Sequence, residues 1–214
     1  MDELIDICDE NMTTLGTAMT SETHRLGLWH HAVHCWLVRP EEPGRVLFQA
    51  RAGGAGLPPG LLDVTSSSHC PTGESFDQCS AAALRQLGLE ADVASLVPLG
   101  TKIDVARLEP EIVIHEFCHV SLLVDARRPD ELHLDHTEVT GVVEISIPDG
   151  LELFADETDE ITAKGTDYDI ASGRWRRVER RLGRSEFFPR PDPYYAKVFI
   201  MSGRLLRQER HLAI

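Results

Sequence analysis

Residues 61–88 read LLDVTSSSHCPTGESFDQCSAAALRQLG, a pattern that predicts a short strand, a polar turn and then a helix. A Gly-Glu-Ser turn opens the helix, which we expect to run from about Ser75 to Leu87. Its apolar residues recur every three or four positions and form one stripe, made of Phe76, Cys79, Ala82, Ala83 and Leu87. Gly88 would end the helix as a C-terminal cap. The stretch therefore predicts a strand followed by a half-buried amphipathic helix.

Apolar runs on both sides of this stretch predict further strands and helices. Before it, we expect strands at Leu4–Asp9, Trp29–Arg39 and Arg45–Arg51, the last two joined by the Pro-Gly turn of Glu41–Gly44. After it, we expect strands at Ala94–Val105, Glu111–Asp125 and Thr140–Ile147, a helix beginning at Pro148 and a last helix at Tyr194–Gln208. This order predicts a mixed sheet packed between helices in a single domain.

The composition excludes several classes of protein. The formal net charge of −14 argues against nonspecific nucleic-acid binding, because a polyanion would be repelled over most of the surface. The five cysteines are scattered and form neither a CxxC pair nor a disulfide framework. The N-terminus MDELIDICDENM does not resemble a signal peptide, and no run approaches the length of about 18 apolar residues that spans a membrane. We therefore expect a cytoplasmic protein without nucleic-acid or membrane partners.

Four segments together resemble a known family. They are DENMTTLGTAM, THRLGLWHHAVHCWLV, GLLDVTSSSHCPTGESFD and EVTGVVEI, and they fall within Leu4–Phe154. This order is similar to the Nudix superfamily, most of all to the branch of isopentenyl-diphosphate isomerase and its hydrolase relatives. The resemblance implies an α/β/α sandwich with a mixed sheet over residues 4–154, with residues 155–214 as a C-terminal helical extension. Members of the family usually cleave a nucleoside diphosphate linked to another group.

The chain departs from the family's Nudix box. That box runs Gly, five residues, Glu, seven residues, then Arg-Glu-x-x-Glu-Glu-x-Gly. Here Ser68 replaces the first Gly, Glu74 matches the first Glu, Ala82 and Ala83 replace Arg-Glu, and the Glu-Glu pair shrinks to Gln86. In the family the box glutamates hold Mg²⁺, a hard cation that needs oxygen ligands. The usual metal site is therefore absent or weakened.

The isomerase-like branch implies a second metal site outside the box helix. The residues that match its pattern are His24, His30, His69 and Glu116, and His24 fits the spacing of the hydrolase-like relatives. Imidazoles with a carboxylate suit Mn²⁺, Fe²⁺ or Zn²⁺ better than Mg²⁺. We therefore expect a divalent metal, and the choice among Mg, Mn, Fe and Zn stays open. Glu111 or His115 is a further candidate ligand. Alternatively, each histidine only satisfies a local hydrogen bond.

The resemblance also implies catalytic residues. Glu116 could act as a metal ligand or as the general base on the attacking water. Glu74 could keep a catalytic role, or it could only complement the dipole at the start of its helix. Ser67 stands where the isomerase has its catalytic cysteine, and a hydroxyl is far less acidic than a thiol. Isomerisation is therefore disfavoured, and we place Ser67 among the substrate-binding residues.

Arginines could bind the phosphate groups of a substrate. Arg51 and Arg45 resemble family positions that contact phosphates, and Arg51 is the stronger candidate. Seven further arginines fall between Arg174 and Arg190. They could contact a diphosphate or an acidic partner, or they could form a solvated face paired with Asp and Glu. The last helix could cover the substrate cleft, close the core or form a homodimer interface.

These observations lead to a metal-dependent hydrolase of a small phosphorylated molecule as the first hypothesis. In it, His24, His30, His69 and Glu116 would hold the metal in place of the box glutamates. A binding or regulatory module with the same fold but no turnover is the second hypothesis, and the lost box residues favour it. A prenyl-diphosphate isomerase is the third, weakened by Ser67.

Overall fold

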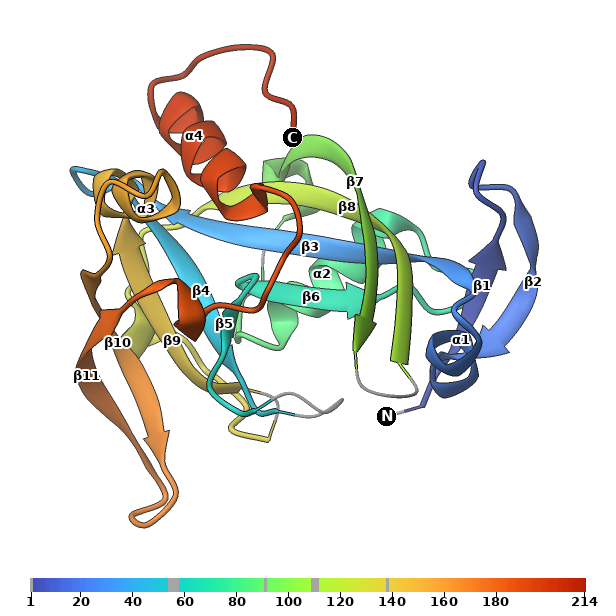
Figure 1. Cartoon of the computed structure of the whole chain (residues 1–214), viewed down its shortest axis with the longest axis horizontal. Helices are drawn as coiled ribbons and strands as arrows, with labels where there is room; N and C mark the ends of the chain where they lie inside the picture. Colours follow the sequence, from blue (N-terminus) through green and yellow to red (C-terminus); the bar gives the residue numbers. More distant parts are fainter. Residues whose placement is uncertain (1, 54–57, 91, 109–111, 138) are drawn as a thin grey trace.

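One mixed sheet runs through the whole molecule in the computed structural model, which describes residues 2–53, 58–90, 92–108, 112–137 and 139–214 (Figure 1). The strands are β1 (Leu4–Cys8), β2 (Thr14–Met19), β3 (Trp29–Arg39), β4 (Arg45–Arg51), β5 (Leu62–Asp63), β6 (Ser66–His69), β7 (Val97–Leu108), β8 (Ile112–Val124), β9 (Val139–Ser146), β10 (Ile161–Asp169) and β11 (Arg174–Leu182). The helices are α1 (Thr20–Leu26), α2 (Phe76–Arg85), α3 (Ile147–Phe154) and α4 (Tyr194–Leu206), besides 3-10 turns at Val93–Ser95, Pro129–Glu131 and Arg184–Glu186.

Strand β3 is the centre of the sheet. The main strand order is β11-β10-β9-β4-β3-β1-β2, while β6 and β8 also pair with β3 and β7 pairs with β8. The β3–β8 pair is parallel, which makes the sheet mixed. Both faces of β3 are covered, and every residue from Ala32 to Arg39 is buried. Its predicted bounds, Trp29–Arg39, are those observed.

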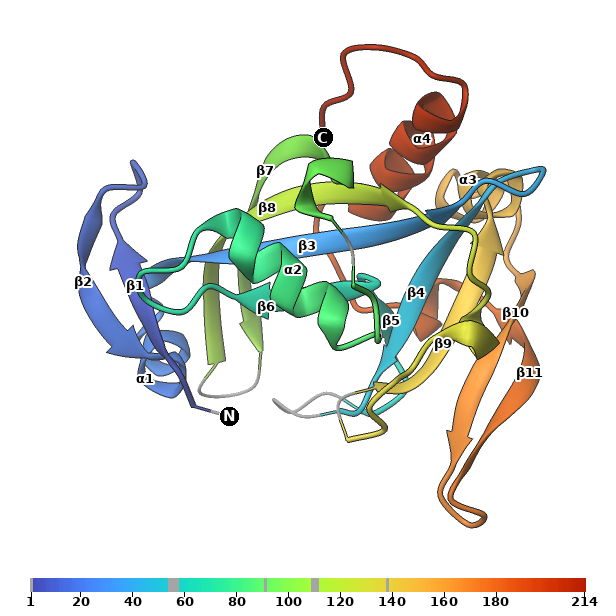
Figure 2. The ribbon, with the colours of Figure 1, turned by 180° about the vertical axis from the view of Figure 1, so that it is seen from behind.

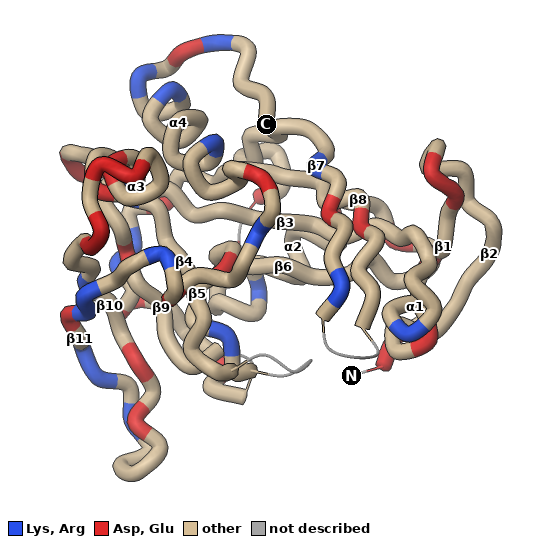
Figure 3. Tube along the Cα trace, viewed as in Figure 1, with Lys and Arg blue, Asp and Glu red and all other residues tan. Residues whose placement is uncertain are grey.

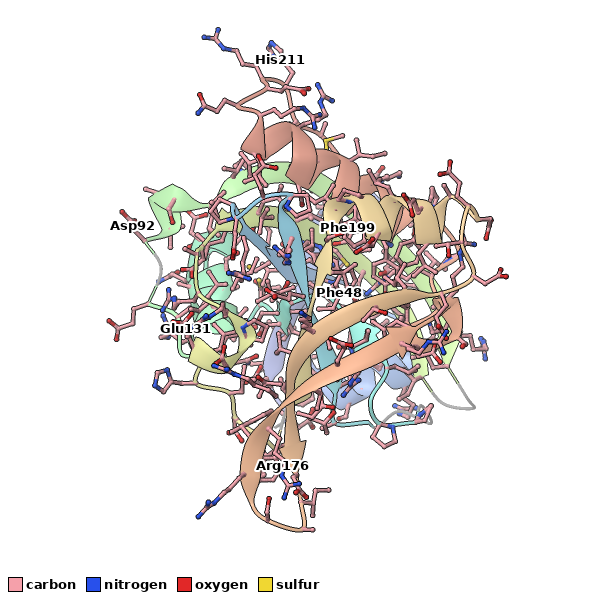
Figure 4. All side chains as sticks on the ribbon, turned by 90° about the vertical axis from the view of Figure 1, so that its left-hand side faces the viewer. Phe48, Asp92, Glu131, Arg176, Phe199 and His211 are labelled. Atoms are coloured by element: carbon pink, nitrogen blue, oxygen red, sulfur yellow. The ribbon has the colours of Figure 1, made fainter. Side chains whose placement is uncertain are left out.

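The two faces of β3 build two hydrophobic layers. Val33, Cys35 and Leu37 belong to the layer that contains the buried residues of α2, and Figure 2 shows α2 lying across β3 and β6. Trp36 and Val38 belong to the other layer, which contains the buried residues of α3 and α4. Figure 4 shows Phe48 of the sheet beside Phe199 of α4, with ring centroids 5.7 Å apart. The molecule therefore has the expected α/β/α layering.

The predicted C-terminal helical extension, residues 155–214, is helical only in part. Residues 161–182 form the β10–β11 hairpin, and β10 pairs with β9 of the central sheet. Helix α4 begins at Tyr194 as expected, and its apolar face packs on the core of the same molecule. The hairpin escapes sequence analysis because its strands alternate between weakly apolar and charged residues, so that β11 reads as an arginine run.

Three arginines of that run pair within the hairpin or beside it. Arg176 pairs with Asp169, Arg180 with Asp167 and Arg181 with Glu160, all within or beside the hairpin. Figure 3 shows basic and acidic positions interleaved along the backbone of β10 and β11. The solvated, self-paired alternative therefore describes these arginines.

Strand β2 and helix α1 were not predicted, and two helix ends differ from those expected, since α4 ends at Leu206 and not at Gln208. Helix α2 starts as expected, because the Ser75 side chain accepts from the backbone N–H of Gln78 and the Gln78 side chain accepts from Ser75 in return. It ends at Arg85, two residues before the predicted Leu87, and Gly88 follows in the left-handed conformation with φ of 69°. None of the helices in the described ranges has the length and apolar character that a membrane crossing needs.

Candidate metal centre and ligand pocket

Strand register brings three of the expected ligands together. In the parallel β3–β8 pair, His30 lies directly opposite Glu116. In the antiparallel β3–β6 pair, His69 lies opposite Ala32, two positions along from His30. Side chains two residues apart on a strand share a face of the sheet. The three side chains therefore meet on one face, across three neighbouring strands.

Helix α1 adds the fourth side chain, His24. The helix ends at Gly27, which caps it with φ of 65° and turns the chain back into β3. A side chain at Gly27 would also meet Val113, since an added Cβ would lie 2.8 Å from its Cγ1. The close approach of α1 to β8 thus depends on the glycine at position 27. This approach places His24 of α1 beside Glu116 of β8.

The four side chains converge on one carboxylate oxygen. The Nε2 atoms of His24, His30 and His69 lie 3.6, 3.4 and 3.6 Å from Oε1 of Glu116. The four candidate ligand atoms all lie within 4.8 Å of one another. Hydrogen bonds of this type are ordinarily about 2.7–3.2 Å long. Four ligand atoms that surround an ion as a tetrahedron, each about 2.1 Å from it, lie about 3.4 Å from one another. The observed separations are closer to this distance than to that of a hydrogen bond.

Two imidazole nitrogens of the cluster lack hydrogen-bond partners within the described ranges. His30 donates from Nδ1 to the carbonyl of Leu28 at 2.9 Å, so Nε2 of the neutral ring would have a lone pair to offer a metal. Nε2 of His30 and Nε2 of His24 are buried and make no hydrogen bond to any of the described residues. Buried polar atoms without partners are rare and call for an explanation. Imidazole nitrogens that face an ionised carboxylate are a ligand set suited to Mn²⁺, Fe²⁺ or Zn²⁺, so the residues fit a divalent metal.

Glu116 is ionised in this setting. Burial by itself raises the pKa of its carboxyl, but the three imidazoles outweigh burial and hold the pKa well below its ordinary value. Its second oxygen, Oε2, accepts from the thiol of Cys118 at 3.6 Å. Burial, followed by the charge of Glu116, raises the pKa of Cys118 well above that of a free thiol. The carboxylate is thus negative and its neighbour is a neutral thiol.

A pocket of about 340 Å³ opens beside the cluster. Its lining consists of His24, Ala32, His34, Arg51, Asp63, Ser67, Ser68, His69, Asp104, Ala106, Leu108, Ile112, Ile114, Glu116, Phe188, Pro189, Arg190 and Pro191. Strands β7 and β8 supply half of its apolar residues, and the segment Phe188–Pro191 supplies most of the others. Arg51 donates from Nη1 to Asp63 at 3.1 Å and lies over the ring of Phe188, while its side chain stays 41% exposed. The pocket therefore combines an apolar wall, the histidine cluster and an accessible cation.

Comparison with known proteins decides the family. An uncharacterized Nudix hydrolase of Clostridium acetobutylicum is 28% identical over 195 residues, 91% of this chain and 94% of that protein. The isopentenyl-diphosphate Delta-isomerase of Streptomyces avermitilis is 32% identical over 149 residues, 67% of this chain and 73% of the isomerase. The chain belongs to the Nudix superfamily. The crystal structure of DR0079 from Deinococcus radiodurans covers 72% of this chain and 89% of its own at 18% identity, with a TM-score of 0.54, and shows the shared fold. No family model matches the chain.

The helix of the Nudix box, α2, packs against the sheet in this protein. Ala83 of α2 is fully buried, and its carbonyl accepts a 2.6 Å hydrogen bond from the Ser66 hydroxyl. Glu74 is exposed and lines a surface hollow with Asp77 and Arg85, apart from the residues of the pocket beside the cluster. The position of Glu74 does not support the predicted catalytic role. Glu74 lies just before the start of α2, and α2 packs on the face of β3 opposite the histidine cluster.

Two other expected residues also lie elsewhere. Arg45 is outside the pocket lining; its Nε lies 3.8 Å from Glu144, on the neighbouring strand β9. His115 donates from Nδ1 to the carbonyl of Gly27 and stacks on Trp29, so it does not join the cluster. Glu111 lies outside the described residues. Ser67 and Arg51 do line the pocket, as expected for substrate-binding residues.

Arg190 has a role that the arginine-rich pattern did not predict. Unlike the exposed arginines of the hairpin, its side chain is only 5% exposed, and it pairs with Asp63 at 2.6 Å and with Asp104. Burial by itself raises the pKa of the Asp63 carboxyl. The positive charges of Arg190 and then Arg51 outweigh burial and lower this pKa to about 2. Three prolines flank or follow Arg190 in the sequence FPRPDP. Prolines at this spacing indicate an extended segment. This signal could have separated Arg190 from the other arginines.

Proposed function

We propose that this Nudix protein is a metal-dependent hydrolase of a small molecule that contains a diphosphate, with His24, His30, His69 and Glu116 as the metal ligands. The convergence of three imidazole nitrogens within 3.6 Å of one oxygen of Glu116 carries the proposal. The relative from Clostridium, which spans nearly the whole chain and is named a Nudix hydrolase, supports the reaction class. The five free cysteines are all buried and suit a reducing compartment, so we place the protein in the cytoplasm.

The pocket supplies the remaining chemistry. A divalent ion in this site would polarise a phosphoryl oxygen as a Lewis acid. Arg51, held by Asp63 and only partly buried, would neutralise negative charge on the phosphate oxygens. Oε1 of Glu116 faces all three imidazoles and Oε2 accepts from Cys118, so its geometry favours the role of ligand over that of general base. The apolar wall, to which β7 and β8 contribute, would shield the reacting group from water.

Isomerisation of a prenyl diphosphate is the second candidate, because several relatives are named isopentenyl-diphosphate isomerases. Ser67 occupies the pocket position at which those enzymes are expected to place a cysteine. The described residues that line the pocket include no cysteine at all. We therefore rank hydrolysis above isomerisation, and a binding module without turnover third.

Metal analysis tests the proposal. The wild-type protein, His69→Ala and Glu116→Ala would be dialysed against Mg, Mn, Fe or Zn and analysed for bound metal, with Glu74→Ala as the matched control. We expect stoichiometric metal in the wild type and in the control, and loss of metal from both cluster variants. Release of phosphate from a panel of diphosphate compounds should be lost in the same two variants. A wild type that binds none of the four metals would favour the binding module.

A further inference from the structure

A buried chain of hydrogen bonds links the C-terminal helix to the pocket. The indole Nε1–H of Trp36 donates to the hydroxyl of Tyr194 at 2.9 Å, and that hydroxyl lies 2.9 Å from Nδ1 of His34. Trp36 and Tyr194 are fully buried and His34 is 4% exposed. His34 lines the pocket, and one of its ring nitrogens lies within 4.8 Å of a carboxylate oxygen of Glu116.

The direction of these hydrogen bonds follows from their partners. An indole nitrogen can only donate, so the Tyr194 oxygen accepts from Trp36. Within the described part of the chain, His34 is the one acceptor in reach of the Tyr194 proton. If His34 donated instead, a fully buried hydroxyl proton would be left without an acceptor, which costs about 1–3 kcal/mol. Tyr194 therefore donates to Nδ1, and the proton of the neutral imidazole lies on Nε2.

The charge state of His34 agrees with this assignment. Burial, and next the nearby Arg190, lower the pKa of His34 to about 4. The ring is thus neutral near pH 7, with Nδ1 as acceptor and Nε2–H as donor. Nε2 makes no hydrogen bond to any of the described residues. It is a free donor at the wall of a pocket that already contains Arg51 and the hydroxyl of Ser67, opposite His34 on β6.

We propose that His34 is a substrate-binding residue that donates Nε2–H to a phosphoryl oxygen, and that Tyr194 is the positioning residue that fixes this tautomer. The inference rests on the proposed function, because it assumes a phosphorylated ligand in this pocket. Ionised phosphate oxygens only accept hydrogen bonds, so a neutral N–H fixed toward them stabilises their charge without having to reorient. The same proton keeps Nε2 from serving as a fourth imidazole ligand, although His34, Glu116 and Cys118 also lie close enough together for a metal.

Nuclear magnetic resonance of the imidazole nitrogens tests the tautomer directly. Long-range ¹H–¹⁵N correlation would be recorded on the Zn²⁺-loaded protein, because Zn²⁺ is diamagnetic. We expect the Nε2–H tautomer of His34 in the wild type and a shift toward the Nδ1–H form in Tyr194→Phe, which removes the proton donor. An Nδ1–H tautomer in the wild type would overturn the inference, whatever the variants do.

Ligand binding tests the role. The probe is methylenediphosphonate, a diphosphate analogue that resists hydrolysis, titrated calorimetrically into the Zn²⁺-loaded protein. We expect the dissociation constant to rise about tenfold in His34→Leu and in Tyr194→Phe, the loss of one hydrogen bond to a charged group. His34→Gln, which keeps an N–H near the Nε2 position, should recover part of the affinity. The exposed His211→Leu is the matched control and should bind like the wild type.

The outcomes separate the two proposals. Stoichiometric Zn²⁺ with wild-type affinity for the probe in His34→Leu would overturn the role of His34 and leave the proposed function standing. A wild type that holds Zn²⁺ but does not bind the probe would overturn both. A second equivalent of Zn²⁺ that disappears in His34→Leu would show that His34 is a ligand, which contradicts the assigned tautomer.

Discussion

At the scale of single residues, the candidate site is organised around one oxygen atom. Oε1 of Glu116 faces Nε2 of His24, His30 and His69, and these atoms come from a helix and three different strands. Without a cation, two of the three nitrogens would be buried with no hydrogen-bond partner in the part of the chain that the structure describes. Burying these nitrogens without partners costs free energy, and a cation bound between the imidazoles and the carboxylate would offset that cost.

Replacing Glu116 with glutamine should abolish tight metal binding. The substitution keeps the shape of the side chain and removes the negative charge. Residues that only orient metal ligands contribute about 10–100-fold to affinity, so we expect the loss of a direct ligand to exceed about 100-fold. Competition titration of Zn²⁺ against a chelating dye would measure it, with Glu74→Gln as the control. Equal affinities of Glu116→Gln and the wild type would exclude Glu116 as a ligand.

The buried carboxyl of Asp63 should make stability depend on pH in the acid range. Its pKa in the folded protein is about 2, below the ordinary value of 3.8, so the folded state holds its proton less tightly than the unfolded chain. The stabilisation, roughly 2 kcal/mol, is present above about pH 4 and is lost as the pH falls toward 2. Urea unfolding at pH 5, 4, 3 and 2.5 should therefore show a shallower decline in Asp63→Asn than in the wild type. Parallel declines would contradict the prediction.

At the scale of elements, a buried ion pair attaches the segment before α4 to the sheet. Arg190 bridges Asp63 of β5 and Asp104 of β7, and its guanidinium also lies over the ring of Tyr194 at 5.1 Å. Asp104 has a second partner in Lys102, at 2.8 Å. This segment carries Phe188 and two prolines into the pocket wall, so the ion pair also shapes the candidate site.

Removing Arg190 should be strongly destabilising. Arg190→Met would leave the carboxylate of Asp63 buried without its main partner, and breaking a buried pair in this way costs about 3–5 kcal/mol. Arg177→Met is the matched control, since Arg177 is 76% exposed in its pair with Asp130 and such pairs contribute about 0–1 kcal/mol. Guanidinium unfolding of both variants would measure the free energies. A loss below about 1 kcal/mol in Arg190→Met would refute the structural role.

The contact between α3 and α4 should make Gly150→Ala destabilising. Alanine favours a helix over glycine by about 1 kcal/mol. A Cβ at Gly150, however, would lie 2.2 Å from a ring atom of Phe199, which is fully buried and has no room to move. Overpacking of this kind costs about 1–3 kcal/mol, so we expect a net loss of stability. Thermal unfolding would show a lower Tm for Gly150→Ala and an unchanged Tm for the exposed Glu152→Ala on the same helix.

At the scale of the whole molecule, one core connects the N-terminal and C-terminal parts of the chain. The larger hydrophobic layer combines residues of β3, β4, β9, β10, α3 and α4. Residues 155–214 therefore complete the sheet and its outer layer, whereas sequence analysis treated them as an addition to a finished core.

We expect the protein to unfold as one cooperative unit, because no part of the larger layer is complete without the rest. Thermal unfolding followed by far-ultraviolet circular dichroism and by tryptophan fluorescence should give coincident transitions, and the calorimetric and van't Hoff enthalpies should agree. Trp36 reports on the core and Trp175 on the hairpin, so fluorescence samples both parts. Two separate transitions would instead support an independent C-terminal extension.

The central strands could be predicted because their signals are local. Trp29–Arg39 and Arg45–Arg51 have apolar centres and are joined by a Pro-Gly turn, and the observed strands have the predicted bounds. Strand β2 and the hairpin strands could not be predicted in this way. They lie toward the sheet edges, where one face meets solvent, so their apolar pattern is weak and pairing with a neighbour decides their structure.

The amino-acid sequence was enough to list the groups that the site could use. His24, His30, His69, Glu116, Ser67 and Arg51 were all named from the resemblance to the Nudix family, and so was the loss of the box glutamates. Which of these groups come into contact depends on the folded chain. Strand register places His30 beside Glu116, α2 carries Glu74 to the opposite face, and a segment 127 residues away from Asp63 supplies its partner Arg190. These outcomes depend on contacts between distant parts of the chain, and local sequence patterns carry no information about them.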